Sequence, residues 1–545
     1  MNSYIGKKGY TIYKNEISLQ QIKKIKDDLT IKPHIHGSPA QNTQQAQNVY
    51  FVYRESNNKI YVPQHYGIKN FGKPTRVELS EGENIDLEFN GQLRDYQIPV
   101  VEKFIKETTL NNTVNGFNYG GGLLELFCAW GKTAASLYIL SKIKKKTIVV
   151  VHKEFLMNQW IERIQQFLPT ARIGRIQGQI IDIENKDIVL CMLQSLSMKD
   201  YPSSMFDCFG FMIVDEVHHI SSEVFSNSLF KIVTRYILGL SATMNRKDGT
   251  TYVFKMFLGD VIYKGHRTEK FNVEVRAIDY RVNDEDFNHV ITDYRGNTSY
   301  SSMITKLCEY NHRSEFILRI LVDLLRENEN QQIMILAHNK NLLKYLFDAI
   351  KHRNIASGSV GYYIGGMKET ALKESENKKI VIATYAMASE GLDIKTLTTL
   401  IMATPKTDIE QSVGRILRDK NENGPLVIDI IDSHDPFKNQ WKKRKAFYMK
   451  EKYKIIHTTN DIYLNTTNTS GNIIWQTIYD PDNVCNTKST KSQQPSHASI
   501  LLTTLMKPKN SKYKKNTENY NITTQPIYND IDSDPFLQGK CFIKI

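Results

Sequence analysis

Cysteines and long apolar runs are scarce in this chain of 545 residues. The six cysteines are scattered and include no Cys-x-x-Cys pair, so the sequence indicates neither a disulfide framework nor a zinc ribbon. No stretch approaches about 18 consecutive apolar residues, and the opening residues MNSYIGKKGYTIYK lack the apolar segment of a secretory signal. These absences favour an intracellular protein with buried free thiols and without a membrane partner.

Acidic residues are outnumbered by basic ones. Lys and Arg total 71 against 58 Asp and Glu, which gives a net charge of +13 and an isoelectric point near 9.1. Such an excess favours a polyanionic partner such as nucleic acid. The length and the 41% content of hydrophobic residues predict several domains with sizeable cores.

A phosphate-binding loop is predicted where the apolar run 123–128 meets Gly131, Lys132 and Thr133. The run favours a buried strand, and the apolar pattern after Thr133 suits a helix. Backbone N–H groups at the helix start, including that of Ala134, can surround phosphate oxygens, while Lys132 reaches the β- and γ-phosphates and Thr133 binds Mg²⁺. The usual first glycine is replaced by Leu126, so a chance surface Gly-Lys-Thr remains an alternative.

A second candidate motif is FMIVDEVHH, residues 211–219, in which four apolar residues run into two carboxylates. A buried strand that ends this way places Asp215 to hold Mg²⁺ and Glu216 to orient or deprotonate water. The alternative is an ordinary strand that ends in an acidic turn.

The order of apolar segments predicts two parallel-sheet domains. Strands near 147–151, 187–193, 211–214 and 236–240 alternate with helical patterns, and a similar series runs from 331 to 431. Such alternation is typical of doubly wound α/β domains, whose ligands gather at the carboxyl ends of the strands. The predicted division is an accessory α+β module at 1–92, a first domain at 93–265, a second domain at 266–456 and a polar, disordered tail at 457–545.

Three smaller features outside these strands support further predictions. The segments 49–53 and 60–62 favour a β-hairpin with a polar turn, and the glycines at 120–122 favour a flexible entry to the first strand. Gln97 carries an amide that can pair with an adenine edge. Because apolar residues are sparse after Asn460, we expect a chain ending near that residue to stay folded.

Candidate residues in the second domain follow its strands. Arg415 and Arg418, three residues apart, are predicted on one helix face, where they could contact the γ-phosphate of a neighbouring nucleotide. The stretch 437–454 is basic with interleaved aromatic residues, which favours a nucleic-acid surface, although a solvated amphipathic helix explains it equally well. Its candidate phosphate contacts are Lys442, Lys443, Arg444 and Lys445.

Seven motifs together resemble the superfamily 2 helicases over about residues 93–453. They are LRDYQ, GKT, IVVVHKEFLMNQW, DEVH, GLSAT, ATYAMASEGLDI and QSVGRILR, in the order of that family. Within it, MNRKDG at 244–249 and GYYIGG at 361–366 resemble the XPB-type group, and most of all the poxvirus-type transcript-release helicases of large nucleocytoplasmic DNA viruses. Phe127 and Ala129 stand where the group usually has Pro and Gly.

The resemblance implies two tandem RecA-like domains, ATP and Mg²⁺ as cofactors, and a role for each motif. Nucleotide contacts are implied for Gln97, Gly131, Lys132, Thr133, Ala134, Asp215, Glu216, Gly391, Asp393, Gln411, Arg415 and Arg418. Coupling of the two domains is implied for His218, Ser241, Ala242 and Thr243. Contacts to a nucleic-acid strand are implied for His152, Lys153 and Thr384.

The resulting hypothesis is an ATP-dependent helicase or translocase, with DNA favoured over RNA, that acts in viral transcription and contacts the transcription machinery. The expected location is the host cytoplasm, virus factory or virion, with the nucleus possible. Three alternatives stay open at this point. They are an ATP-dependent RNA helicase, a nucleic-acid-binding scaffold with impaired ATP turnover, and a nuclease-coupled motor, for which the sequence offers no metal-ligand cluster outside the nucleotide site.

Overall fold

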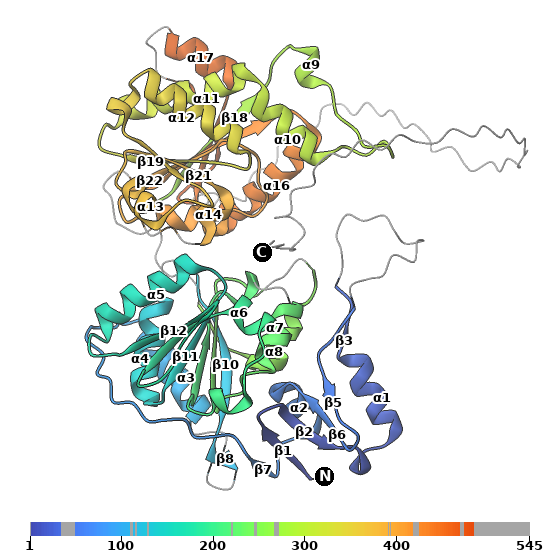
Figure 1. Ribbon diagram of the computed structural model, residues 1–545. Coiled ribbons are helices and arrows are strands. Elements are labelled where there is room, and N and C mark those ends of the chain that lie inside the picture. Colours follow the sequence, from blue (N-terminus) through green and yellow to red (C-terminus); the bar gives the residue numbers. More distant parts are fainter. Residues whose placement is uncertain are drawn as a thin grey trace, which may run out of the picture. The chain divides into compact units, whose positions relative to one another are not determined.

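The protein contains two parallel-sheet α/β domains preceded by a smaller α+β module (Figure 1). This arrangement is seen in a computed structural model, which confirms the predicted fold class. The model describes residues 2–33, 49–109, 113–114, 117–127, 130–219, 222–244, 248–265, 272–390, 392, 394–417, 424–468 and 473–483.

The N-terminal module is built on a five-stranded sheet of order β5-β6-β2-β1-β7. Its strands are β1 (Ser3–Gly6), β2 (Gly9–Tyr13), β5 (Arg54–Glu55), β6 (Lys59–Val62) and β7 (Arg76–Val77), accompanied by helices α1 (Leu19–Asp28) and α2 (Gln64–Phe71).

The hairpin predicted in this module is confirmed only for the strands that flank the polar turn, β5 and β6. The earlier part of the predicted strand, β4 (Tyr50–Phe51), pairs instead with β3 (Thr30–Ile31). The hairpin is therefore shorter than its β-prone sequence suggested.

The N-terminal module shares one hydrophobic core with the first domain. Side chains of its inner sheet face, such as Tyr10 and Ile60, belong to the same buried cluster as Phe225 and Phe254 of the first domain. Helix α2 also packs against α8 (Thr251–Leu258). The predicted boundary at residue 92 therefore separates two sequence segments but not two independent cores.

The first domain has an eight-stranded sheet of order β13-β12-β14-β11-β15-β16-β10-β17, in which β13 alone pairs antiparallel. The strands are β10 (Gly120–Glu125), β11 (Thr147–Val151), β12 (Ile173–Gln177), β13 (Ile180–Asp182), β14 (Ile188–Met192), β15 (Phe211–Val214), β16 (Tyr236–Ser241) and β17 (Val261–Lys264). Its helices include α3 (Ile98–Thr109), α4 (Lys132–Ile143), α5 (Glu154–Phe167), α6 (Leu193–Met198) and α7 (Ser222–Leu229).

The three consecutive glycines form part of strand β10, so the predicted flexible entry is wrong. They pair in parallel register with β16. A Cβ at Gly120 would lie 2.7 Å from the backbone oxygen of Thr108, and one at Gly122 would lie 2.2 Å from Cδ1 of Ile262. Close packing of β10 against its neighbours, rather than backbone flexibility, explains the glycines.

The second domain repeats the plan with a sheet of order β20-β21-β19-β22-β23-β18-β24-β25. Its strands are β18 (Glu274–Tyr280), β19 (Gln332–Ala337), β20 (Val360–Tyr363), β21 (Ile380–Thr384), β22 (Leu397–Met402), β23 (Leu426–Asp432), β24 (Lys454–Thr459) and β25 (Gln476–Tyr479). Its helices are α9 (Glu285–Asn288), α10 (Tyr300–Glu309), α11 (Asn311–Glu327), α12 (Lys340–His352), α13 (Glu369–Glu376), α14 (Tyr385–Glu390), α15 (Glu410–Val413), α16 (Asp435–Lys450) and α17 (Asn460–Asn468).

The second domain extends past residue 456, so a disordered tail beginning at 457 is wrong for its first part. Strand β24 pairs with β18 from the Glu274–Lys454 pair to the Asp279–Thr459 pair. Tyr463 on α17 is 3% exposed, and its hydroxyl donates to Oδ2 of Asp323 at 3.3 Å. A polar segment can fold here because it joins a sheet that already exists. Residues 484–545 lie outside the described part of the chain.

Candidate active site

The phosphate loop joins α4 at a position whose backbone conformation favours glycine. Gly131, directly before α4, has φ +92°, and a Cβ there would lie 2.4 Å from Nε2 of Gln97. Lys132 and Thr133 follow as the first two residues of the helix, and Ala134 is the third. The predicted strand, loop and helix are therefore present, whereas Ala129 lies outside the described residues.

Gln97 and Trp130 hold this loop in place. Nε2 of Gln97 donates to the backbone oxygen of Trp130 at 2.9 Å, and its Oε1 accepts the backbone N–H of Arg94 at 2.9 Å. The Tyr96 hydroxyl donates to the same Trp130 oxygen at 3.3 Å. The Gln97 amide thus orders the loop, while its contact with adenine stays a prediction.

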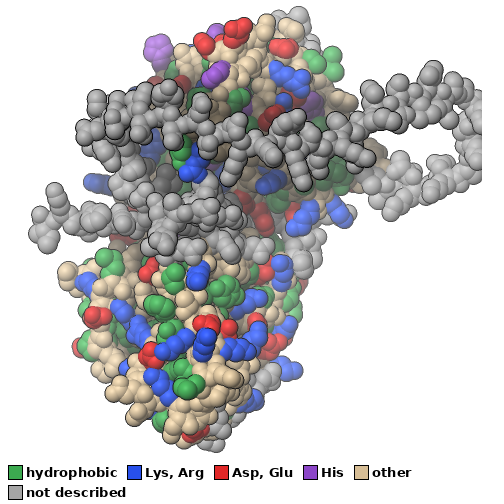
Figure 2. Space-filling view, turned by 90° about the vertical axis from the view of Figure 1, so that its right-hand side faces the viewer, with side chains coloured by type: hydrophobic (Ala, Val, Ile, Leu, Met, Phe, Trp, Pro, Cys, Tyr) green, Lys and Arg blue, Asp and Glu red, His purple; other side chains and the backbone are tan. Residues whose placement is uncertain are grey.

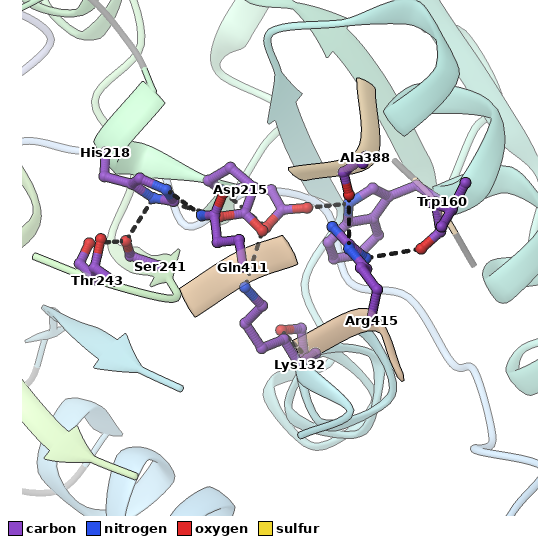
Figure 3. A network of polar contacts seen from close by, with 12 residues as sticks. Lys132, Trp160, Asp215, His218, Ser241, Thr243, Ala388, Gln411 and Arg415 are labelled. Carbon is purple, nitrogen blue, oxygen red and sulfur yellow. Dashed lines mark hydrogen bonds and ion pairs between the residues drawn. The ribbon is translucent and has the colours of Figure 1, made fainter. Parts of the chain in front are cut away.

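The two carboxylates follow the carboxyl end of β15, where Figure 3 labels Asp215, and Glu216 contacts Lys132 of the loop. Glu216 adopts φ +47°, a left-handed conformation that is costly for a residue with a Cβ. Its Oε1 pairs with Nζ of Lys132 at 2.9 Å, where the two side chains are 16% and 13% exposed. In this arrangement the lysine expected to hold phosphate is engaged by the expected base.

Asp215 is buried beside Glu216, and its environment acts on its pKa in opposite directions. Burial raises the pKa of Asp215, and the Glu216 carboxylate raises it further. Lys132 and two N–H donors act in the lowering direction. The donors are the Glu216 backbone N–H, 2.9 Å from Oδ1, and the Trp160 indole, whose Nε1 lies 2.8 Å from Oδ2.

Carboxylate and hydroxyl oxygens are the ligands that Mg²⁺ prefers, so the donor set of Asp215 and Thr133 fits this ion. Bound there, Mg²⁺ would neutralise charge on the phosphates. Among the described residues, no group of three or more His, Cys, Asp or Glu side chains is placed to hold a metal ion.

A chain of hydrogen bonds runs from the DEVH motif to the second domain (Figure 3). Nε2 of His218 lies 2.9 Å from Nε2 of Gln411, and Nδ1 lies 2.8 Å from Oγ of Ser241. The Ser241 hydroxyl in turn donates to the backbone oxygen of Thr243. If the Gln411 amide donates, His218 must carry its proton on Nδ1, which leaves each donor in the chain with an acceptor. Ala242, between Ser241 and Thr243, is 8% exposed.

The predicted helix 411–418 is interrupted. Helix α15 ends at Val413, and a single 3-10 turn follows over Gly414–Ile416. Arg415 donates from Nε to the backbone oxygen of Ala388 at 2.9 Å and from Nη1 to that of Leu392 at 2.8 Å. Arg418, Gly391 and Asp393 lie outside the described residues, so the predicted pairing of two arginines stays a prediction.

The candidate nucleic-acid residues divide into exposed and buried side chains. Arg444 is 0% exposed and forms two 2.8 Å bonds with Asp429, so its assignment as a phosphate contact is wrong. It fails because α16 turns this side chain towards β23. Tyr448 and Tyr453 are buried in the same core.

The other candidate nucleic-acid residues are at least partly exposed to solvent, except His152. Lys442 and Lys443 are exposed, and Lys445 and Thr384 are partly exposed. His152 is only 8% exposed, which disfavours direct contact through its ring, whereas the adjacent Lys153 before α5 is partly exposed.

Trp160 and Trp130 are functional candidates that the sequence did not reveal. Both are 2–3% exposed, and such large apolar residues at helical spacing are more often core than site. The contact of Trp160 with Asp215 depends on which face of α5 is turned towards the sheet. The contact of Trp130 with Gln97 depends on the path of the loop. The QW pair at 159–160, inside a motif of the family, was the available signal.

The two parallel-sheet domains, with a phosphate loop beside two carboxylates in the first of them, are typical of a two-domain ATPase of the helicase class. The family model described as "Type III restriction enzyme, res subunit" matches residues 90–246. The model described as "Helicase conserved C-terminal domain" matches residues 317–420. The chain belongs to the superfamily 2 helicases, and it is accordingly an ATP-hydrolysing helicase.

Its relatives include proteins of large DNA viruses. The chain is 36% identical over 454 residues to "Putative ATP-dependent RNA helicase L396" of Acanthamoeba polyphaga mimivirus, covering 82% of this chain and 85% of the relative. It is 27% identical to "Putative helicase 161L" of Invertebrate iridescent virus 6, covering 80% and 96%. It is 28% identical to "Putative ATP-dependent RNA helicase QP509L" of African swine fever virus, covering 67% and 74%. None of the described helices has the length and apolarity needed to cross a membrane.

Proposed function

We propose that this helicase is a DNA-dependent motor of the XPB-like, poxvirus-type group. In this proposal it acts in viral transcription inside the infected cell and releases transcripts or remodels stalled complexes. The observation that carries the choice of DNA is the distribution of positive charge. Residues 1–80 contain 12 Lys and Arg against five Asp and Glu, a net charge of +7, whereas residues 81–483 contain 50 against 49.

The N-terminal sheet carries part of this charge on its outer face. Tyr4, Tyr13 and Tyr61 alternate with the buried residues of the inner face, so they share the outer face. Cations lie over these rings: Arg76 at 4.6 Å from Tyr4, Lys59 at 5.1 Å from Tyr4 and 4.8 Å from Tyr13, and Lys8 at 5.0 Å from Tyr61.

Cations interleaved with aromatic rings suit a phosphate backbone better than a protein core. Figure 2, which faces the side where Figure 1 draws this module, shows many Lys and Arg side chains in its lower half, interspersed with Asp and Glu. A broad basic face outside the ATPase domains is suited to duplex DNA, which carries two phosphate backbones. Phosphate contacts alone do not distinguish DNA from RNA, so the polymer itself must be tested.

The proposed ATPase cycle assigns roles to motif residues described above. Lys132 and Thr133 would hold the phosphates together with Mg²⁺, Asp215 would ligate the ion, and Glu216 would activate water. Arg415 completes the site by stabilising charge on the γ-phosphate, and the contact between His218 and Gln411 links the domains as they close and open. This assembly across two domains couples hydrolysis to steps along a strand.

The test compares ATPase rates without polymer and with duplex DNA, single-stranded DNA or RNA at one salt concentration. Duplex DNA should stimulate most, and a stronger response to RNA would favour the RNA helicase named among the relatives. Turnover that stays low with every polymer would favour the scaffold.

The binding face is tested by a triple substitution, Lys8→Gln, Lys59→Gln and Arg76→Gln. It should flatten the salt dependence of DNA binding by up to about 0.9 power per lost phosphate contact. The matched control removes the same charge from exposed lysines on helices of the two larger domains, namely Lys106, Lys142 and Lys344. Equal effects of the two triples would reject a specific N-terminal face and leave only a general charge effect.

A further inference from the structure

Trp160 contacts the site through a single, well-defined hydrogen bond. The residue lies in the middle of α5 and is 2% exposed. Its indole Nε1–H donates to Oδ2 of Asp215 at 2.8 Å (Figure 3). An indole can only donate, and this bond is made to an atom of the proposed Mg²⁺ ligand rather than to a backbone carbonyl.

The bond fixes the plane of the Asp215 carboxylate. Oδ1 accepts the Glu216 backbone N–H at 2.9 Å, and Oδ2 accepts the indole, so the two oxygens are held from two separate elements. One donor belongs to the turn after β15 and the other to α5. A carboxylate bound at one oxygen can rotate about its last torsion, whereas one bound at both oxygens has a single orientation.

We infer that Trp160 is a positioning residue, which orients the Asp215 carboxylate towards Mg²⁺ and makes the metal affinity of the site depend on the position of α5. The inference rests on the proposed role of Asp215 as a metal ligand. Leu156, Met157 and Ile164 pack α5 against the sheet, so the helix carries the indole as part of a rigid unit. The helix begins directly after Lys153, a proposed nucleic-acid contact, so a strand held there can influence the ion through Trp160.

The sharpest test replaces only the donor. Incorporating 3-benzothienylalanine at position 160 keeps the shape of the indole but puts sulfur in place of N–H, and Trp160→Phe provides a genetically simple second variant. The control Ile164→Val removes one methyl group from another fully buried side chain of α5. Thermal melting establishes that all variants are folded.

The readout is binding of a fluorescent ADP analogue with and without Mg²⁺. In both Trp160 variants the affinity without Mg²⁺ should change less than about three-fold, while the gain in affinity that Mg²⁺ confers should fall by about 10–100-fold, as for other residues that orient metal ligands. Ile164→Val should keep that gain. An unchanged Mg²⁺ effect in the folded benzothienylalanine variant, or an equal loss in Ile164→Val, would overturn the inference.

Asp215→Asn separates this inference from the function on which it rests. If Asp215→Asn loses the Mg²⁺ effect and the Trp160 variants keep it, only the role of Trp160 is wrong. If Asp215→Asn itself keeps the Mg²⁺ effect, the assignment of Asp215 as a metal ligand is wrong, and the inference falls with it.

Discussion

Replacing Glu216 with Gln should tighten ATP binding while it stops turnover. In the described structure Lys132 pairs with Glu216 at 2.9 Å, so a phosphate must compete with a carboxylate for the same ammonium. Gln keeps a neutral acceptor for the ammonium but removes the carboxylate charge, and we expect the ion pair to exceed the remaining bond between a cation and a neutral amide by about 1–2 kcal/mol. Because Gln inherits the φ of +47°, backbone strain cancels in the comparison.

That free-energy difference predicts a Kd for ATP lower by about 5–30-fold. Turnover should fall by at least ~100-fold, which is the usual contribution of a general base. Titration with a fluorescent ATP analogue gives the first value, and a stimulated ATPase assay gives the second. Glu83→Gln is the control because it weakens another lysine–carboxylate pair, with Lys146 at 2.8 Å, which lies directly before strand β11 and so at the end of the sheet opposite Glu216. Weaker ATP binding in Glu216→Gln would refute the competition, and near-normal turnover would remove Glu216 from catalysis.

Three further predictions concern single elements of the fold. Gly131→Ala should weaken nucleotide binding by about 10-fold or more, because it places a Cβ at positive φ against Gln97; unchanged affinity would show that the loop adapts. Arg444→Ala should lower the free energy of unfolding in urea by about 3–5 kcal/mol, because it leaves the buried Asp429 carboxylate without its cation and with the Tyr448 hydroxyl as a neutral donor, while the exposed neighbour Lys443→Ala should change it by less than ~0.5 kcal/mol. A chain ending at residue 460 should lose about 3–5 kcal/mol with Tyr463, whereas one ending at 483 should melt like the full chain, and equal melting of both would show that neither α17 nor β25 contributes to stability.

The elements predicted well from the sequence are those in which a local pattern determines the structure. The strand, loop and helix around Lys132 follow from an apolar run, one glycine and helical spacing within about 20 residues. The strand that ends at Asp215 follows from four apolar residues. The positions of the central strands along the chain could be predicted in both domains because parallel sheets leave continuous apolar segments, whereas the order of the strands within each sheet was not predicted.

The elements predicted badly depend on distant partners. Trp160 and Asp215 lie 55 residues apart, and their bond requires the correct phase of α5 against the sheet. The basic stretch around Arg444 predicts an exposed surface, yet Arg444 pairs with Asp429 of the preceding strand, and both side chains are fully buried. The composition around Tyr463 predicts disorder, because composition counts apolar residues but does not show which part of the fold they can join.

The core shared by the N-terminal module and the first domain has a consequence for how the protein is made. Lys7 pairs with Asp207, 200 residues later, and Arg235 binds the backbone oxygen of Leu79 across 156 residues. At about 5–20 residues per second, a ribosome completes the partners of the first strands on the order of 10–40 s after those strands emerge. During that interval the N-terminal sheet lacks the first domain that buries its apolar face, so we expect the nascent chain to need chaperone protection before the nucleotide site is complete.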